Sequence, residues 1–162
     1  MNIVRLDTEQ TPSPAGSGEL VMADAGHLFV VFLPMRRGAA VASKSHNIAV
    51  ATFINYAQMT FGYPNEDAFE GLFPGLVNAF YEITDSDWNT RLTEQNQITF
   101  PDNRIAFNRR HFLMPCKETT LHVLASDMVI RTYDEPFTDV AMGLLRRELD
   151  GEELTVCPRI DE

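Results

Sequence analysis

Cysteine, tryptophan and long apolar runs are all scarce in this sequence of 162 residues. The two cysteines, Cys116 and Cys157, form no Cys-x-x-Cys motif and no paired Cys/His spacing, which excludes a zinc finger and a disulfide-rich scaffold. The longest apolar run, Leu28 to Leu33, is far too short to cross a bilayer, and the first residues contain no secretory hydrophobic segment. We therefore expect a cytoplasmic protein with reduced thiols, in which Cys116 is a small buried residue.

Basic residues are also few. There are 13 of them against 23 acidic residues, which leaves a net charge of −10. Such a charge disfavours nucleic acids and anionic membranes as partners. An acidic surface either keeps a protein in solution or docks a basic partner. The acids that we consider for docking stand in two regions rich in acidic residues and are Glu66, Asp67, Glu70, Asp134 and Glu135.

The common catalytic motifs are missing as well. The sequence has no Gly-x-x-x-x-Gly-Lys phosphate loop, no Gly-x-Ser-x-Gly elbow and no His-Glu-x-x-His pair. We therefore expect no metal or cofactor. What is present is a composition that is 44% hydrophobic, which predicts one globular domain over residues 1–162. Residues 8–18, with two prolines and two glycines, predict a loop or flexible arm.

Several short apolar or β-branched segments predict strands. The run Leu28 to Leu33 is typical of a strand that is buried on both faces. A short helix is expected near residues 86–96, after Asp85 or Ser86 as the N-cap, and a C-terminal helix near 137–149 has one apolar face. Because strands and helices do not alternate strictly, the pattern predicts an α+β fold with a mostly antiparallel sheet. The other expected strands cover residues 48–54, 76–84, 111–115, 119–125 and 128–133.

Two histidines in the predicted hairpin form the best candidate site. If Lys117-Glu118 lie in the turn, the position numbers of facing residues add up to 235, and His111 is diagonal to His122. If the turn lies one residue earlier, the two histidines face each other directly. In both registers the imidazoles share one face of the sheet. They could then hold a metal, with Glu118 or Asp127 as a further ligand, or act as an acid/base pair near neutral pH. The simpler interpretation, which we favour, is that each is a half-buried histidine satisfied by hydrogen bonds.

Trp88 is the single tryptophan, and it follows the aromatic pair Phe80-Tyr81. It is expected either to anchor the short helix on the sheet or to stack on a small molecule, with Tyr81 and Arg109 lining the pocket. Arg109 could bind a carboxylate or a phosphate. We favour the anchoring role.

Several segments follow one another in a recognisable order and spacing: Gly62-Tyr63-Pro64-Asn65, residues 81–88, Asn96, Pro101 and residues 107–125. These segments resemble a family of small bacterial proteins of uncharacterised function. The resemblance covers about residues 60–126. It departs at polar positions, because the family usually has His-Asp where this chain has Lys117-Glu118, Glu where it has His122, and His-Pro where it has Phe100-Pro101. The resemblance therefore implies a shared fold and no reaction.

Together these features predict a non-catalytic protein-interaction module rather than an enzyme. Its small size and acidity are comparable to those of bacterial immunity proteins, which bind basic toxic enzymes, and the expected partner is accordingly a basic protein. One alternative is a metal-assisted or acid/base hydrolase centred on His111 and His122. Another is a small-molecule binding module at Trp88, Tyr81 and Arg109.

Overall fold

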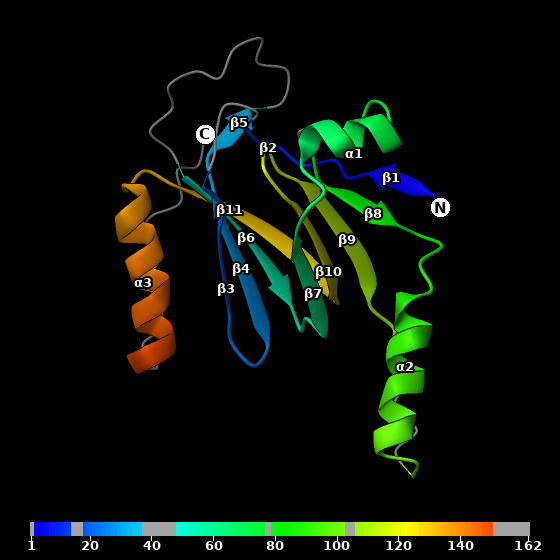
Figure 1. Cartoon of the computed structure of the whole chain (residues 1–162). Coiled ribbons are helices and arrows are strands. Elements are labelled where there is room, and N and C mark those ends of the chain that lie inside the picture. The colour runs from blue at the N-terminus through cyan, green and yellow to red at the C-terminus, as the bar shows by residue number, and fades with distance from the viewer. Residues whose placement is uncertain (1, 14–17, 37–47, 77–78, 103–105, 151–162) are drawn as a thin grey trace.

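Two antiparallel sheets lie face to face in the computed structural model, which describes residues 2–13, 18–36, 48–76, 79–102 and 106–150 (Figure 1). The five-stranded sheet has the order β1-β8-β9-β10-β7, and the four-stranded sheet has the order β11-β6-β4-β3. A two-stranded ribbon pairs β2 with β5. This architecture confirms the predicted α+β class with mostly antiparallel strands.

The bounds of the elements are as follows. The five-stranded sheet contains β1 (Ile3–Arg5), β7 (Gln58–Gly62), β8 (Tyr81–Ile83), β9 (Arg110–Pro115) and β10 (Thr120–Ala125). The four-stranded sheet contains β3 (Leu20–Ala23), β4 (His27–Phe32), β6 (Ile48–Ile54) and β11 (Asp127–Tyr133). The ribbon consists of β2 (Gln10–Pro12) and β5 (Pro34–Arg36). The helices are α1 (Glu66–Leu72), α2 (Trp88–Thr99) and α3 (Phe137–Asp150).

The main core lies between the two sheets, because alternate residues of each strand point inward. Phe53 of β6 and Phe112 of β9 meet edge to face across this core, with ring centroids 5.5 Å apart. Cys116 is buried there, as predicted, with 2% of its surface exposed. Cys157 lies outside the described residues.

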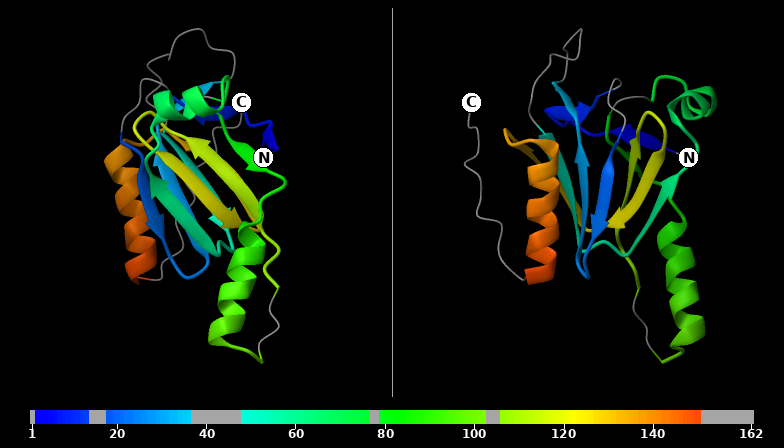
Figure 2. Two further views of the ribbon diagram at one scale, coloured as in Figure 1. Left: turned by 45° about the vertical axis from the view of Figure 1, so that its right-hand side comes forward. Right: turned by 60° about the vertical axis from the view of Figure 1, so that its left-hand side comes forward.

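Two helices cover parts of the outer faces. Val140 and Leu144 of α3 pack on Phe29 and Val31 of β4, so that this strand is buried on both faces as the apolar run predicts. On the opposite side, Phe69 of α1 packs on the outer face of the five-stranded sheet. The third helix, α2, points away from both sheets (Figure 2). Within the described ranges, no helix is long and apolar enough to span a bilayer.

The prediction of a loop or arm over residues 8–18 is wrong for part of its length. Residues 10–12 form β2, and Thr11 and Ser13 are buried. The prediction failed because proline is tolerated in an edge strand: Pro12 stands opposite Pro34 in the short ribbon with β5. Residues 14–17 lie outside the described part of the chain.

Candidate functional site

The β9–β10 hairpin brings His111 and His122 together on the outer face of the five-stranded sheet. His111 is paired with Leu124, and His122 with Leu113, so that facing positions add up to 235 and the histidines are diagonal neighbours. This is the register predicted for a Lys117-Glu118 turn. The Nε2 atom of His111 lies 3.0 Å from the Nδ1 atom of His122, within hydrogen-bond distance.

Ser86 adds a third polar group to this pair. It belongs to the segment between β8 and α2, and its Oγ lies 2.7 Å from the Nδ1 atom of His111. The same Oγ accepts a hydrogen bond of 3.2 Å from the backbone N–H of Trp88. Ser86, His111 and His122 therefore form one continuous hydrogen-bonded chain that crosses three segments of the sequence.

Trp88 fixes the geometry of this chain. Its indole ring meets the ring of His111 edge to face, with centroids 4.9 Å apart. Its Nε1 donates a hydrogen bond of 2.8 Å to Oε1 of Gln58 on β7. These two contacts attach the first turn of α2 to the sheet, as expected of an anchoring residue.

Both histidines are held in the neutral form at pH 7. His111 is only 8% exposed, and burial lowers its pKa to about 4. The charge that His122 takes up at acid pH and the charge of Arg91 lower this pKa further, and Asp87 has a weak opposing effect. Burial also lowers the pKa of His122. A neutral imidazole has one N–H donor and one bare nitrogen acceptor, so His111 can accept a proton from one neighbour while it donates to the other.

A surface depression of about 360 Å³ opens beside Ser86 and His111, and Asn89, Arg109 and Arg110 are also among its lining residues. The side-chain amide of Asn89 is bonded to the backbone of Arg109, accepting from its N–H at 3.0 Å and donating to its carbonyl at 2.6 Å. Nε of Arg109 donates to the backbone carbonyl of Asn55, a group without net charge. Arg109 therefore brings positive charge to the edge of the depression.

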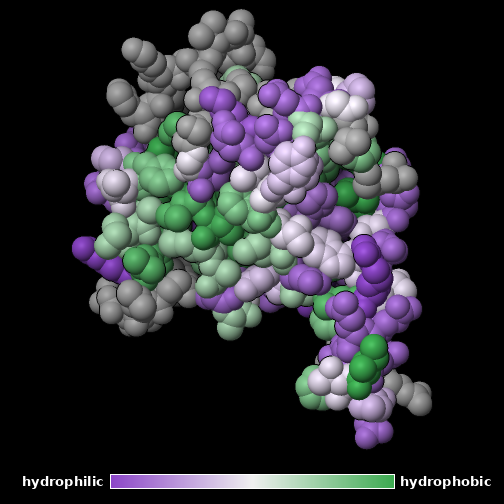
Figure 3. All heavy atoms as spheres, in the orientation of Figure 1, coloured by the Kyte–Doolittle hydropathy of each residue, from purple (hydrophilic) through white to green (hydrophobic). Residues whose placement is uncertain are grey.

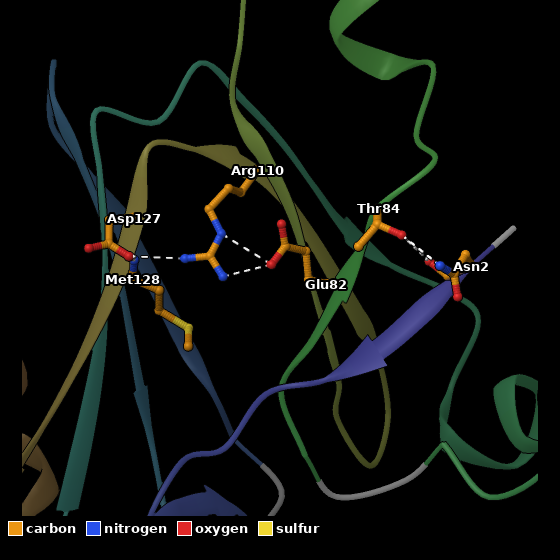
Figure 4. A network of polar contacts seen from close by, with 6 residues as sticks. All are labelled: Asn2, Glu82, Thr84, Arg110, Asp127 and Met128. Atoms are coloured by element: carbon orange, nitrogen blue, oxygen red, sulfur yellow. Dashed lines mark hydrogen bonds and ion pairs between the residues drawn. The ribbon is translucent and has the colours of Figure 1, made fainter.

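Arg110 has a different role, because its charge is already balanced. Figure 4 shows its guanidinium between the carboxylates of Glu82 and Asp127. Nε and Nη2 lie 3.1 and 2.6 Å from Oε2 of Glu82, and Nη1 lies 3.2 Å from Oδ1 of Asp127. Since Glu82 is on β8 and Asp127 is on β11, this residue links the two sheets. Asp127, which the sequence offered as a possible metal ligand, forms an ion pair with Arg110 in the structure.

Two of the predicted site residues lie apart from the histidines. Glu118 is exposed in the hairpin turn, at the end of β9 that is opposite to His111. Tyr81 is buried in the cluster of Phe69 and Leu113 under α1. Neither belongs to the chain of Ser86, His111 and His122.

The predicted docking acids are not brought together in one surface. Asp67 and Glu70 are exposed on α1, while Asp134 is exposed and Glu135 half-buried in the link that leads to α3. These two helices cover outer faces of different sheets. The side chain of Glu66 lies outside the description.

In the described part of the chain, no group of three or more His, Cys, Asp and Glu side chains is arranged to hold a metal ion. No family model, curated protein or solved structure matches this chain.

Ser86 is the member of this site that sequence reasoning missed. The sequence predicts only an N-cap role for it, because a serine before a helix is common and carries no catalytic signal. Its position next to His111 depends on how the segment after β8 crosses the end of β9. Ser86 and His111 are 25 positions apart in the sequence. Such a contact between distant segments leaves no local pattern in the sequence.

Proposed function

We propose that this protein is a protein-interaction module that binds a basic partner through an arm formed by α2 and the residues on either side of it, Asp87 to Asp102. The observation that carries the proposal is that α2 has no buried residue along its 12 positions. The helix points away from the sheets in every view (Figures 1 and 2).

A helix of this kind gains little stability from its own sequence. Isolated helices shorter than about 12–15 residues are marginal in water, and helices in proteins are stabilised mostly by packing of an apolar face. The sequence of α2 includes three threonines and two asparagines, which are weak helix formers. Hydrogen bonds attach the first half of the helix to the segment that leads into β9. Asn89 accepts from the N–H of Arg109, and Oγ1 of Thr93 accepts from the N–H of Phe107. A partner surface would complete the stabilisation of the second half.

The far end of the arm carries two exposed apolar residues. Ile98 is 82% exposed and Phe100 is 56% exposed. The surrounding surface over α2 is mostly hydrophilic, with isolated hydrophobic spots (Figure 3). Large apolar side chains surrounded by polar groups are typical anchors of a protein–protein contact.

The charge of the arm favours a basic partner. Residues 87–102 contain three acidic residues and one basic residue, which gives a net charge of −2. The one base, Arg91, is paired with Asp87 at 3.0 Å, which leaves Glu94 and Asp102 as exposed acids along the arm. The negative charge of the whole chain adds to this attraction at long range.

Affinity capture with the full chain tests this proposal. Partners are captured from an extract of the source cells and compared between the wild type and the double variant Ile98→Ser/Phe100→Ser. A specific basic protein is expected to bind the wild type and to lose at least about tenfold in affinity for the double variant, because the apolar anchors are gone.

The matched control is Met142→Ser on α3, where the replaced side chain is 48% exposed. The free energy of unfolding of both variants should lie within about 0.5 kcal/mol of the wild-type value, because the replaced side chains are exposed and make few contacts in the folded chain. Equal capture by wild type and double variant would refute the role of the arm. Loss of capture in the Met142 variant alone would assign binding to α3 instead.

A further inference from the structure

We propose that Ser86, His111 and His122 form a catalytic site for ester hydrolysis, with Ser86 as the nucleophile, His111 as the general base and His122 as the residue that positions it. The proposal does not depend on the binding of a partner by the arm. It rests on the continuous hydrogen-bonded chain of the three side chains and on the depression that both Ser86 and His111 line. Nucleophile, base and orienting group within hydrogen-bond distance of one another are the signature of such a site.

The hydrogen bonds assign a direction to the chain. Ser86 Oγ accepts the N–H of Trp88, and its own hydroxyl proton can then be donated to Nδ1 of His111. A neutral His111 with a bare Nδ1 carries its proton on Nε2, which donates to Nδ1 of His122 at 3.0 Å. When His111 takes the serine proton, the positive charge is shared with His122, which is less buried than His111.

The reaction balances without a metal or cofactor. Ser86 Oγ attacks the carbonyl carbon of the ester, and the new carbon–oxygen bond forms as the hydroxyl proton passes to His111. The bond to the leaving alcohol breaks as that alcohol takes the proton from His111. Water, deprotonated by His111, then attacks the acyl-serine, the acid leaves and Ser86 regains its proton.

The charge around the depression indicates the substrate class. Arg110 is neutralised by Glu82 and Asp127, whereas the hydrogen bond of Nε of Arg109 goes to an uncharged carbonyl. We infer that the substrate is a small ester with an anionic group that binds Arg109. Monosuccinate and acetate esters of 4-nitrophenol distinguish this: the succinate should react faster with wild type, and Arg109→Gln should remove the preference. Equal rates with wild type would refute the anionic substrate.

A fluorophosphonate probe tests the nucleophile directly, because an activated serine displaces its fluoride and forms a stable adduct. The full chain is incubated with the probe, digested and mapped by mass spectrometry. We expect labelling of Ser86 that is absent in Ser86→Ala, unchanged in the control Ser126→Ala, and about a hundredfold slower in His111→Gln. An unlabelled Ser86 in folded protein, or equal labelling in His111→Gln, overturns the proposal.

The pH profile of labelling separates a chemical role of His122 from a structural one. The charged and titratable groups that act on His111 are His122 on β10, Arg91 on α2 and Asp87 before α2. Wild-type labelling should fall as the pH drops toward 4, because protonated His122 cannot accept the N–H of His111 and because His111 itself takes up a proton at about pH 4. His122→Asn keeps a side-chain acceptor that does not titrate, so its labelling should fall only with the protonation of His111. His122→Ala should be labelled more slowly than His122→Asn at pH 7, because it leaves Nε2 of His111 without an acceptor. Equal rates for the Ala and Asn variants, or an acid limb of His122→Asn identical to that of the wild type, would overturn the positioning role.

Discussion

His111 is a polar side chain whose environment favours the uncharged imidazole. Its two ring nitrogens are engaged by Ser86 and His122, so the burial of the neutral ring leaves no hydrogen-bonding group unsatisfied. Protonation would place a charge in a site that is 8% exposed. The folded state therefore binds a proton more weakly than the unfolded chain does.

This difference predicts how stability depends on pH. The pKa of His111 falls from 6.5 to about 4 on folding. The stabilisation that comes from the neutral form is complete above pH 6.5 and is lost as the pH falls toward 4, because the unfolded chain takes up the proton first. The loss amounts to roughly 3 kcal/mol at most. Urea unfolding at pH 7.0 and pH 4.5 measures it.

The control for this experiment is His111→Gln, which keeps a polar side chain and removes the titration. Its unfolding free energy should change less between the two pH values than that of the wild type. Parallel changes in both proteins would assign the pH dependence to other groups. The hydrogen bond from the N–H of Asn2 is the main cause that lowers the pKa of Asp85. Carboxyl groups of this kind take up their protons at a more acidic pH than the histidine of the unfolded chain does.

The histidine pair was predictable from the sequence, whereas Ser86 was not. A hairpin with a short turn fixes its own register, so the positions of His111 and His122 follow from the turn at Lys117-Glu118. Ser86 reaches His111 through the path of the chain after β8, which no local rule determines. The role of Trp88 was predicted as an anchor, but its partners, Gln58 and His111, are known only from the structure.

At the scale of elements, the attachment of α2 depends on Asn89. Its amide makes two hydrogen bonds to the backbone of Arg109, at 2.6 and 3.0 Å, and thereby fixes the returning chain beside the first turn of the helix. Asn89→Ala is expected to loosen α2, because each lost hydrogen bond contributes about 0.5–1.5 kcal/mol. Hydrogen exchange of the amides of α2 should become faster, while β9 and β10 keep their protection.

The control for this variant is Gln97→Ala, at an exposed position of the same helix. This change should leave exchange in α2 unchanged or slow it slightly, since alanine is the better helix former. Unchanged exchange in Asn89→Ala would mean that the helix is held by other contacts, such as the bond between Thr93 and Phe107.

Elements with strong patterns were predicted, and weak ones were missed. The strands β4 and β6 are nearly continuous apolar runs, and α3 has a clear apolar face. By contrast, α1 has only seven residues, and of its described side chains only Phe69 is buried. Of the predicted strand over 76–84, the described residues form only the three of β8, and residues 77–78 lie outside the described part of the chain. Short elements contain too few residues to show a period, so tertiary packing decides them.

At the scale of the whole molecule, the division of the strands between two sheets could not be read from the sequence. β10 and β11 are consecutive and separated only by Ser126, yet they belong to different sheets. Ser126 donates its N–H to the carbonyl of Ile54 at 2.9 Å, which places the chain on the four-stranded sheet. The alternation of apolar residues predicts which face of a strand is buried, but it does not predict which sheet the strand joins.

The link between the sheets at Arg110 leads to a prediction for the whole fold. Its guanidinium joins Glu82 of the five-stranded sheet to Asp127 of the four-stranded sheet, and its centre lies 4.7 Å from the ring centroid of Phe112. Arg110→Met keeps an apolar stem and removes both ion pairs. Because the arginine is 40% exposed, solvent weakens each pair, and we expect a loss of about 1–2 kcal/mol in the free energy of unfolding.

Arg91→Met is the matched control, because Arg91 forms a similar ion pair with Asp87 within the exposed arm, where the two side chains are 63% and 74% exposed. An exposed pair at this helical spacing contributes about 0.3–0.5 kcal/mol, so the free energy of unfolding of this variant should be close to that of the wild type. Urea titration followed by Trp88 fluorescence measures both variants. If the two variants lose equal stability, Arg110 does not hold the sheets together, and the apolar core between them accounts for their contact alone.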